Sequence, residues 1–191
     1  MATSEKVVVV KLPKFERMNI HIRGTAPLIV HRWSEKGKKQ LLDDFQLKPK
    51  QPKEPKNPER EYADSLYVLD DGRYGFPASG FKKAIVRAGT YADMKMTFLR
   101  GVVMVEGEYI VIDGTPQMRE DIVKIQMTID LRYRGEFRVW ESTIPIIFNA
   151  GIISADQILN LIQIAGFAVG IGEWRPEKGG SYGTFSIVEG A

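Results

Sequence analysis

A glycine-rich segment at residues 170–183 limits the possible folds of this chain more than any other stretch. It reads GIGEWRPEKGGSYG, follows an apolar helix pattern at 155–167 and precedes a short strand pattern at 184–188. Glycine reaches backbone angles that other residues avoid, and it lets a second backbone come close. Such a loop between a helix and a last strand predicts that the end of the chain returns to the edge of a sheet.

The side chains between these glycines suit nucleic acid. Trp174 and Tyr182 can stack on bases, and Arg175 and Lys178 can pair with phosphates. The loop is not a Walker phosphate loop, because no lysine is followed by Ser or Thr at a helix start, and its glycines do not open a helix as in a dinucleotide fingerprint. Two interpretations stay open: a nucleic-acid cradle, or a tight turn whose Trp174 packs on the core.

A second motif, GFPASGFKKAIVRA at 75–88, carries a strand through a turn into a helix. Phe81, Ala84, Ile85 and Ala88 recur at helical spacing and predict one buried stripe. The free amides at such a helix start suit a phosphate. On the opposite face lie three basic side chains, Lys82, Lys83 and Arg87. They form either a phosphate-binding wall or an ordinary solvated face.

The other elements alternate between strands and helices. Strands are expected at 15–30, with a break at 24–27, and at 122–132 and 137–148, separated by 133–136. Hairpins are expected at 67–76, where Asp-Gly marks a turn, and at 102–112. Helices are expected at 35–45, capped by Ser34 and burying Leu41, Leu42 and Phe45, at 59–66, and at 155–167, capped by Ser154. The mixture predicts an α+β fold with an antiparallel, ferredoxin-like (RRM-type) sheet.

Length and charge narrow the classes of protein further. A chain of 191 residues fits a single domain, 1–191, and its net charge of +3 equals that of the segment 46–60 alone. Prolines alternate with lysines in that segment, which predicts a flexible basic arm. The chain has no cysteine, which excludes disulfides and cysteine-bound metal. Its apolar runs are too short for a signal peptide or a membrane span, so a soluble cytoplasmic protein is expected.

A third basic and aromatic cluster, RYRGEFR, occupies residues 132–138. We interpret it as a turn or bulge, either a solvated hairpin end or a further nucleic-acid contact through Arg132 and Arg134.

Candidates for catalysis are few. The only histidines are His21, which points to the outer face of its strand, and His31, at a strand end. His31 could act as a general base beside a 2′-hydroxyl, although an ordinary surface histidine is the alternative. The paired carboxylates at 43–44 and 70–71 are interpreted as structural, and no residue spacing indicates a metal or cofactor site.

Two motifs together resemble the RAMP superfamily, the repeat-associated proteins of CRISPR systems. Residues 75–88 resemble that family's Ile-Pro-Gly-Ser-Ser-Leu-Lys-Gly-Ala-Leu-Arg segment, and the loop at 170–183 resembles its glycine-rich loop before the last strand. The break TAPL at 25–28 is similar to that in the family's opening strand. The chain departs from the pattern at Ala78 and Lys83, where the family has glycine.

The resemblance implies a modified ferredoxin-like fold and, within the family, a subunit like those that form the backbone of CRISPR effector complexes along a guide RNA. By this analogy, residues 99–121 are a hairpin insertion that contacts the next subunit, and 46–60 is a flexible insertion. Such a compact chain fits a member encoded by a phage or mobile element.

The sequence therefore predicts a non-catalytic, largely sequence-independent binder of single-stranded nucleic acid, RNA rather than DNA, that assembles as a homo-oligomer or as part of a larger complex. The expected contacts are Lys48, Lys50, Lys53, Lys82, Lys83, Arg87, Arg132, Arg134, Trp174, Arg175, Lys178 and Tyr182, with Trp33 as a further stacking candidate. The alternatives are a metal-independent RAMP-like endoribonuclease using His31, and a protein-interaction module or viral mimic that docks on a CRISPR complex.

Overall fold

The computed structural model describes residues 12–48, 55–125 and 128–188. Its main layer is an antiparallel sheet in the order β4-β8-β1-β9, formed by β1 (Phe15–Gly24), β4 (Val103–Val105), β8 (Glu141–Asn149) and β9 (Phe185–Ile187). A second sheet has the order β2-β7-β6, formed by β2 (Leu28–Val30), β6 (Pro116–Ile125) and β7 (Thr128–Phe137). Two short strands, β3 (Gly75–Pro77) and β5 (Tyr109–Val111), pair with each other. The α+β class expected from the sequence is confirmed.

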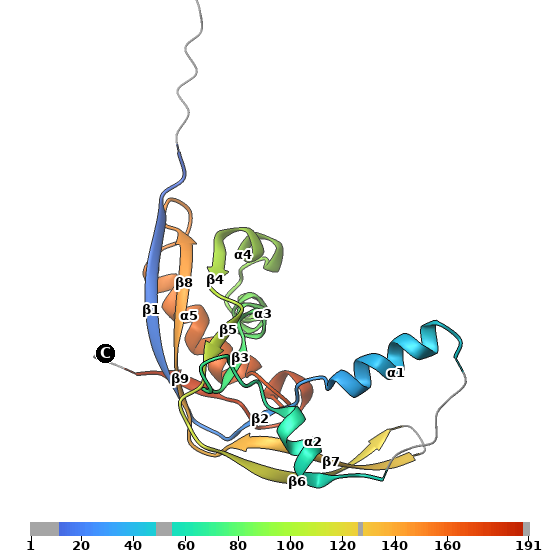
Figure 1. Cartoon of the computed structure of the whole chain (residues 1–191). Helices are drawn as coiled ribbons and strands as arrows, with labels where there is room; N and C mark the ends of the chain where they lie inside the picture. The colour runs from blue at the N-terminus through green and yellow to red at the C-terminus, as the bar shows by residue number, and fades with distance from the viewer. Residues whose placement is uncertain (1–11, 49–54, 126–127, 189–191) are drawn as a thin grey trace, which may run out of the picture.

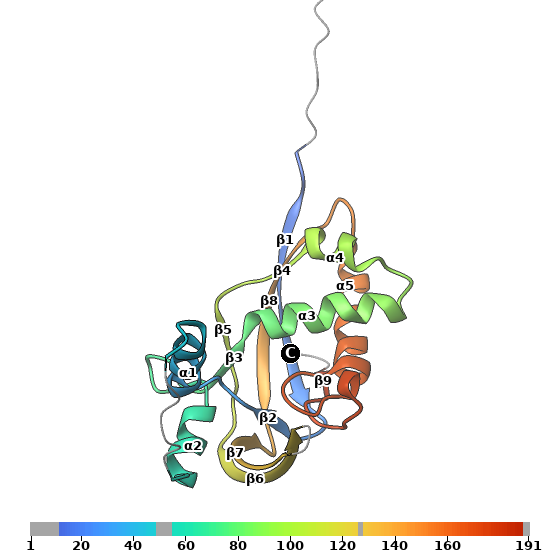
Figure 2. The ribbon, with the colours of Figure 1, turned by 90° about the vertical axis from the view of Figure 1, so that its right-hand side faces the viewer.

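Helices cover one face of the main sheet. The helix α3 (Ala78–Ala88) crosses that face and packs against α5 (Ala155–Ile164), which continues as a π turn (Ala165–Val169) (Figure 2). The predicted stripe on α3 is confirmed, since Phe81, Ala84, Ile85 and Ala88 are all buried. Ser154 caps α5 through a reciprocal capping box with Gln157, so its start was also predicted correctly.

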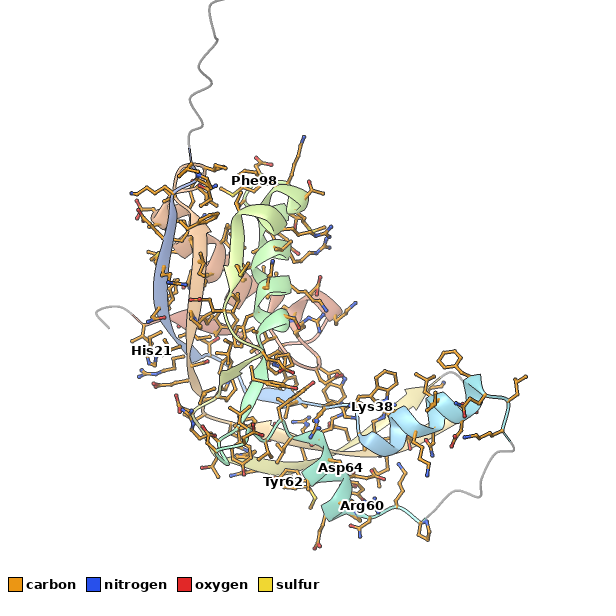
Figure 3. All side chains as sticks on the ribbon, turned by 45° about the horizontal axis from the view of Figure 1, so that its top comes forward. His21, Lys38, Arg60, Tyr62, Asp64 and Phe98 are labelled. Carbon is orange, nitrogen blue, oxygen red and sulfur yellow. The ribbon has the colours of Figure 1, made fainter. Side chains whose placement is uncertain are left out.

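The strand alternation in β1 is also confirmed. Ile20 and Ile22 are buried under the helices, and Ile20 faces Ile144 of β8. His21 lies on the opposite, outer face, where its imidazole is 3.0 Å from Glu141 Oε2 (Figure 3). The alternation of apolar and polar residues along β1 therefore predicted correctly which side chains face the helices and which face outward.

The break after β1 transfers the chain from the first sheet to the second. A Cβ at Gly24 would lie 2.1 Å from the indole Nε1 of Trp140, so only glycine lets the strand approach that ring. The same indole Nε1 donates a hydrogen bond to Ala26 O, at 2.9 Å. The run 15–30 therefore belongs to both sheets, and the second sheet extends away from the first as an arm (Figure 1).

That arm is a long hairpin with a helix on it. Strands β6 and β7 pair from Pro116↔Phe137 to Ile125↔Thr128, and α2 (Pro58–Ser65) packs on β7. Gly135 donates its amide to Ser65 Oγ at 2.9 Å, and a Cβ there would lie 2.3 Å from Leu66 Cδ2. The close approach of α2 explains the glycine.

Two strand assignments from the sequence are wrong. The expected strand at 122–132 spans parts of β6 and β7, and the expected separator at 133–136 lies inside β7, because Gly135 serves packing rather than a turn. The cluster at 132–138 is therefore mostly strand rather than a turn or bulge. Residues 126–127, between β6 and β7, lie outside the described residues.

The expected hairpin at 102–112 is also wrong. Strand β4 pairs with β8, and β5 pairs with β3, so these neighbours in sequence join different sheets. The short helix α4 (Met96–Val102), which precedes β4, was not predicted. At 67–76 the hairpin is reduced to a single bridge, Val68↔Tyr74, around the Asp-Gly turn.

The helix α1 (Glu35–Phe45) has the expected bounds and the expected Ser34 cap, whose Oγ accepts the Gly37 amide at 3.1 Å. Its expected burial is wrong. Leu41, Leu42 and Phe45 are exposed by 38%, 53% and 77%, and α1 projects from the body of the molecule (Figure 1). The helix pattern was correct, but no described element of this chain covers its apolar face.

In the described ranges, none of the helices has the length and apolar content needed to cross a lipid bilayer.

Candidate nucleic-acid interface

A groove of about 720 Å³ is lined by residues of α3 on one side and of the glycine-rich loop on the other. The two motifs singled out in the sequence therefore form the two walls of one groove. Its lining also includes His31, Tyr67 and Phe76.

The first wall begins where β3 turns into α3. Phe76 packs edge-on against the buried Phe81, with ring centroids 5.8 Å apart, and this contact fixes the helix start. Pro77 at the N-cap makes no side-chain hydrogen bond, and the Ala78 amide donates to Glu108 O at 2.9 Å. The amides of Ser79 and Gly80 are therefore the donors left for a ligand. Lys82 and Lys83 project from this turn into the groove.

The second wall is a loop folded back on itself. The amide of Ile171 donates to Gly183 O at 3.0 Å, and the Gly183 amide donates to Pro27 O at 2.8 Å. Gly183 has φ 65°, and a Cβ there would lie 1.8 Å from Ile171 O. The glycines therefore build a tight turn, and that turn forms a groove wall; a contact of this wall with nucleic acid stays a prediction.

Glu177 connects the two walls electrostatically. Its Oε2 accepts from Arg175 Nη2 at 3.0 Å, and its Oε1 forms an ion pair with Arg87 Nε at 3.2 Å, without hydrogen-bond geometry. Arg175 also donates to Gly172 O at 3.0 Å, within its own loop. Arg87 and Arg175 line the groove as expected, but both already have partners in this chain.

Four other basic side chains on the groove have no ion-pair or hydrogen-bond partner among the described residues: Lys82, Lys83, Arg100 and Lys178. Arg100, from α4, was not expected from the sequence, because its helix was missed. These four cations are the groove's available charge.

The two aromatic rings of the loop lie outside this lining. Trp174 and Tyr182 contact each other at 6.0 Å, and the guanidinium of Arg119 lies 5.4 Å and 4.9 Å from their centroids. Arg119 also bonds Asp121 at 2.8 Å and Glu136 at 2.7 Å. Partial burial lowers its pKa, but these carboxylates raise it above the usual value, so Arg119 stays charged. These contacts connect the loop to β6, and base stacking by Trp174 and Tyr182 stays a prediction.

Arg134 and Arg132 differ from expectation. Arg134 is buried on β7, with its guanidinium 5.5 Å from the Trp174 ring centroid and 3.4 Å from Asp121, so it is not available to a nucleic acid. Burial lowers its pKa, and the charges of Glu173 and Asp121 oppose that shift. Arg132 is half-buried and lies 3.3 Å from Asp130. The cluster at 132–138 thus serves mainly the hairpin's internal packing.

His31 lies on the groove at the end of β2. Desolvation in the groove lowers the pKa of His31, and the positive charges of Arg134 and Arg132 lower it further, against the opposing charge of Glu173. The imidazole is therefore neutral at pH 7. Burial raises the pKa of the neighbouring Tyr67, which keeps its hydroxyl protonated.

The basic arm contributes little to the described site. Lys48 pairs with Asp43 at 3.0 Å beyond the end of α1, and it does not line the groove. Lys50 and Lys53 lie outside the described residues. Within the described ranges, no group of His, Asp or Glu side chains is arranged to hold a metal ion.

Comparisons with known proteins address the fold. No protein-family model matches this sequence, and no curated protein matches it significantly. Among solved structures, the chain resembles a chain of the type III-B Cmr-beta complex bound to cognate target RNA, with a TM-score of 0.52 and 11% identity. The match covers 92% of this chain but 60% of that one, so this chain spans well under two thirds of its length.

Two further solved structures are similar with TM-scores below 0.5, too low to support the fold assignment. They are Cmr6 from Pyrococcus furiosus (TM-score 0.46, 6% identity, 93% and 100% covered) and a chain of a CRISPR RNA-guided surveillance complex (0.38, 9% identity, 85% and 65% covered). At these identities only the fold is shown. The α+β, ferredoxin-type fold expected from the sequence is confirmed.

Proposed function

We propose that this protein binds single-stranded nucleic acid, RNA in preference to DNA, along the groove between α3 and the glycine-rich loop, without catalysing a reaction. One observation carries the proposal. Lys82, Lys83, Arg100 and Lys178 line a single groove, and none has a described partner in the chain. Unpaired cations that converge beside a helix N-terminus suit a phosphate backbone.

The salt dependence of binding follows from the number of these groove cations, which is four. For single strands, the logarithm of the affinity falls with the logarithm of salt with a slope of about −0.7 for each phosphate neutralised. Four cations therefore give a slope near about −3, or roughly a fiftyfold loss of affinity between about 50 mM and 200 mM salt.

A pair of variants tests the site. Lys82→Gln with Lys83→Gln removes two groove cations, and the slope should become less steep by about 1.4. The matched control, Lys95→Gln with Lys124→Gln, removes two exposed lysines that do not line the groove. Titration of a labelled RNA strand at several salt concentrations measures both slopes. Equal slopes in the two double variants would rule out the groove as the phosphate site.

Repeating the titration with a DNA strand of the same sequence tests the preference for RNA, which requires contacts to the 2′-hydroxyl. Tighter binding of RNA is expected.

We also propose that copies assemble along the strand. The apolar face of α1 (Leu41, Leu42 and Phe45) is not covered by any described element of the chain. An isolated helix of this length is marginal in water, so a partner surface stabilises it. Exposed apolar side chains also occur at the opposite end of the molecule, where Phe98 lies far from Lys38 of α1 (Figure 3). A head-to-tail contact between copies would bring these two ends together.

One observation favours a second candidate function, a metal-independent endoribonuclease. His31 is neutral on the groove and could accept a proton from a 2′-hydroxyl, while the protonated Tyr67 could donate one. If this activity exists, the wild type cleaves RNA in the presence of EDTA, and His31→Ala does not. An RNA left intact by the wild type would remove this candidate.

A further inference from the structure

The groove contains one carboxylate, that of Glu173, whose charge acts on the buried Arg134 but whose oxygens accept no hydrogen bond from any described residue. Glu177 is held by Arg87 and Arg175, at 3.2 Å and 3.0 Å. Glu173 also lines the groove, yet its carboxylate makes no hydrogen bond or ion pair with any residue in the described ranges. Its charge partly offsets the cost of burying Arg134, and its oxygens keep their capacity to accept hydrogen bonds from a ligand in the groove.

The backbone holds Glu173 firmly in position. Its amide donates to Ile29 O in β2 at 2.9 Å, and at the preceding Gly172 a Cβ would lie 2.4 Å from that same oxygen. The following residue, Trp174, has φ 51°, a left-handed conformation that is unusual for a large side chain. This reversal lets Trp174 pack toward Arg119 and Arg134 while Glu173 lines the groove.

The surroundings of Glu173 suit a base better than a phosphate. Its neighbours on the groove are His31 at the end of β2 and Tyr67, whose ring lies 6.0 Å from that of Phe76. Aromatic rings offer surfaces for stacking, and a carboxylate can only accept hydrogen bonds. The lysines of α3 lie on the other wall and contact the backbone of any sequence equally.

Building on the proposed function, we propose that Glu173 accepts a hydrogen bond from the exocyclic amino group of an unpaired base in the groove. Cytosine presents an amino donor at position 4, whereas uracil presents a carbonyl oxygen there. That oxygen would face the carboxylate with no proton between them, so the groove discriminates against uracil. The phosphate contacts remain independent of sequence, and the preference is confined to one position in the bound strand.

The experiment compares two homopolymers, oligo(C) and oligo(U), of equal length at slightly alkaline pH and low salt. Both are pyrimidine strands, so the comparison changes mainly the edge that faces Glu173. The wild type should bind oligo(C) roughly tenfold more tightly, the lower part of the range for one base contact. Glu173→Gln keeps the size of the side chain, and its amide can donate to uracil as well as accept from cytosine.

The variant should therefore bind both strands with nearly equal affinity. The matched control, Glu108→Gln, removes the same charge from an exposed side chain that does not line the groove, and it should keep the tenfold ratio. Equal affinities in the wild type, or an unchanged ratio in Glu173→Gln, would overturn the inference and leave the proposed function standing. Failure of the wild type to bind either strand would overturn the proposed function and the inference together.

Discussion

At the residue scale, the glycines of the loop differ in what they require. Gly183 combines φ 65° with a neighbouring carbonyl, because a Cβ there would lie 1.8 Å from Ile171 O. Gly179 has φ 78°, but no atom lies within 4 Å of the position that its Cβ would take. Substituting each glycine by alanine therefore distinguishes the free-energy cost of a left-handed backbone, at Gly179, from the added cost of a steric overlap, at Gly183.

Gly179→Ala should lower the free energy of unfolding by about 1 kcal/mol, the usual cost of a left-handed alanine. Gly183→Ala should lower it by more than about 3 kcal/mol, because the overlap is with backbone that cannot move aside. Urea denaturation of both variants measures the difference. Similar losses in the two variants would mean that the loop does not fold back as described.

Some residues gave no signal in the sequence. Arg119 was missed because its ring partners, Trp174 and Tyr182, lie far along the chain, and no local pattern connects them. Trp174 was assigned to base stacking since aromatic and basic residues alternate in its loop. In the structure, the guanidinium of Arg119, from the same chain, contacts the faces of these rings.

At the element scale, residue patterns predicted the faces of single helices and strands correctly, but they did not predict which elements pack or pair with each other. The stripe of α3 and the alternation of β1 were predicted correctly, because each face pattern extends over several residues. Ser34 predicted where α1 begins, but no cap can show whether another element covers the helix. Alternation in β6 and β7 identified strand but not the position of the hairpin turn.

The contact that joins β6 to the glycine-rich loop can be tested. Arg119→Met removes the guanidinium that contacts both rings and two buried carboxylates. It should lower the free energy of unfolding by about 2 kcal/mol. The loss is smaller than for a buried carboxylate left with no cation, because Arg134 stays near Asp121 and Arg138 stays near Glu136.

The control for this variant is Arg17→Met, which removes an exposed ion pair with Glu106 at 3.4 Å. It should change stability by less than about 1 kcal/mol. Chemical denaturation compares the two, and an equally small effect of Arg119→Met would show that the cluster contributes little to holding the loop.

At the scale of the whole molecule, the shape places apolar surface at two distant ends. The helix α1 projects beside the hairpin arm, and α4 lies at the far end of the main body (Figure 1). A contact between unlike ends leaves a free end on each copy, so it generates a row of copies, or a ring where the rotation closes, rather than a symmetric pair. This geometry agrees with assembly along an extended strand.

Leu42→Ser with Phe45→Ser should therefore prevent assembly on a long RNA while leaving the affinity for a short one unchanged. A short strand of about eight nucleotides fits one copy and does not depend on neighbours. Sedimentation velocity with each strand measures the assembly. Phe167→Ser, which removes an equally exposed ring elsewhere, should assemble normally. Persistence of the assemblies in the double variant would exclude α1 as the contact.

The passage of one strand run through both sheets has a mechanical consequence. Residues 25–27 form an elbow between the main sheet and the hairpin arm. The end of the glycine-rich loop is hydrogen-bonded to this elbow: the Gly183 amide donates to Pro27 O, and the Thr25 amide donates to Thr184 O. The wall formed by α3 belongs to the body, whereas the opposite wall is tied to the elbow and, through Arg119, to the arm. We therefore expect a movement of the hairpin arm to change the width of the groove and so the grip on a bound ligand.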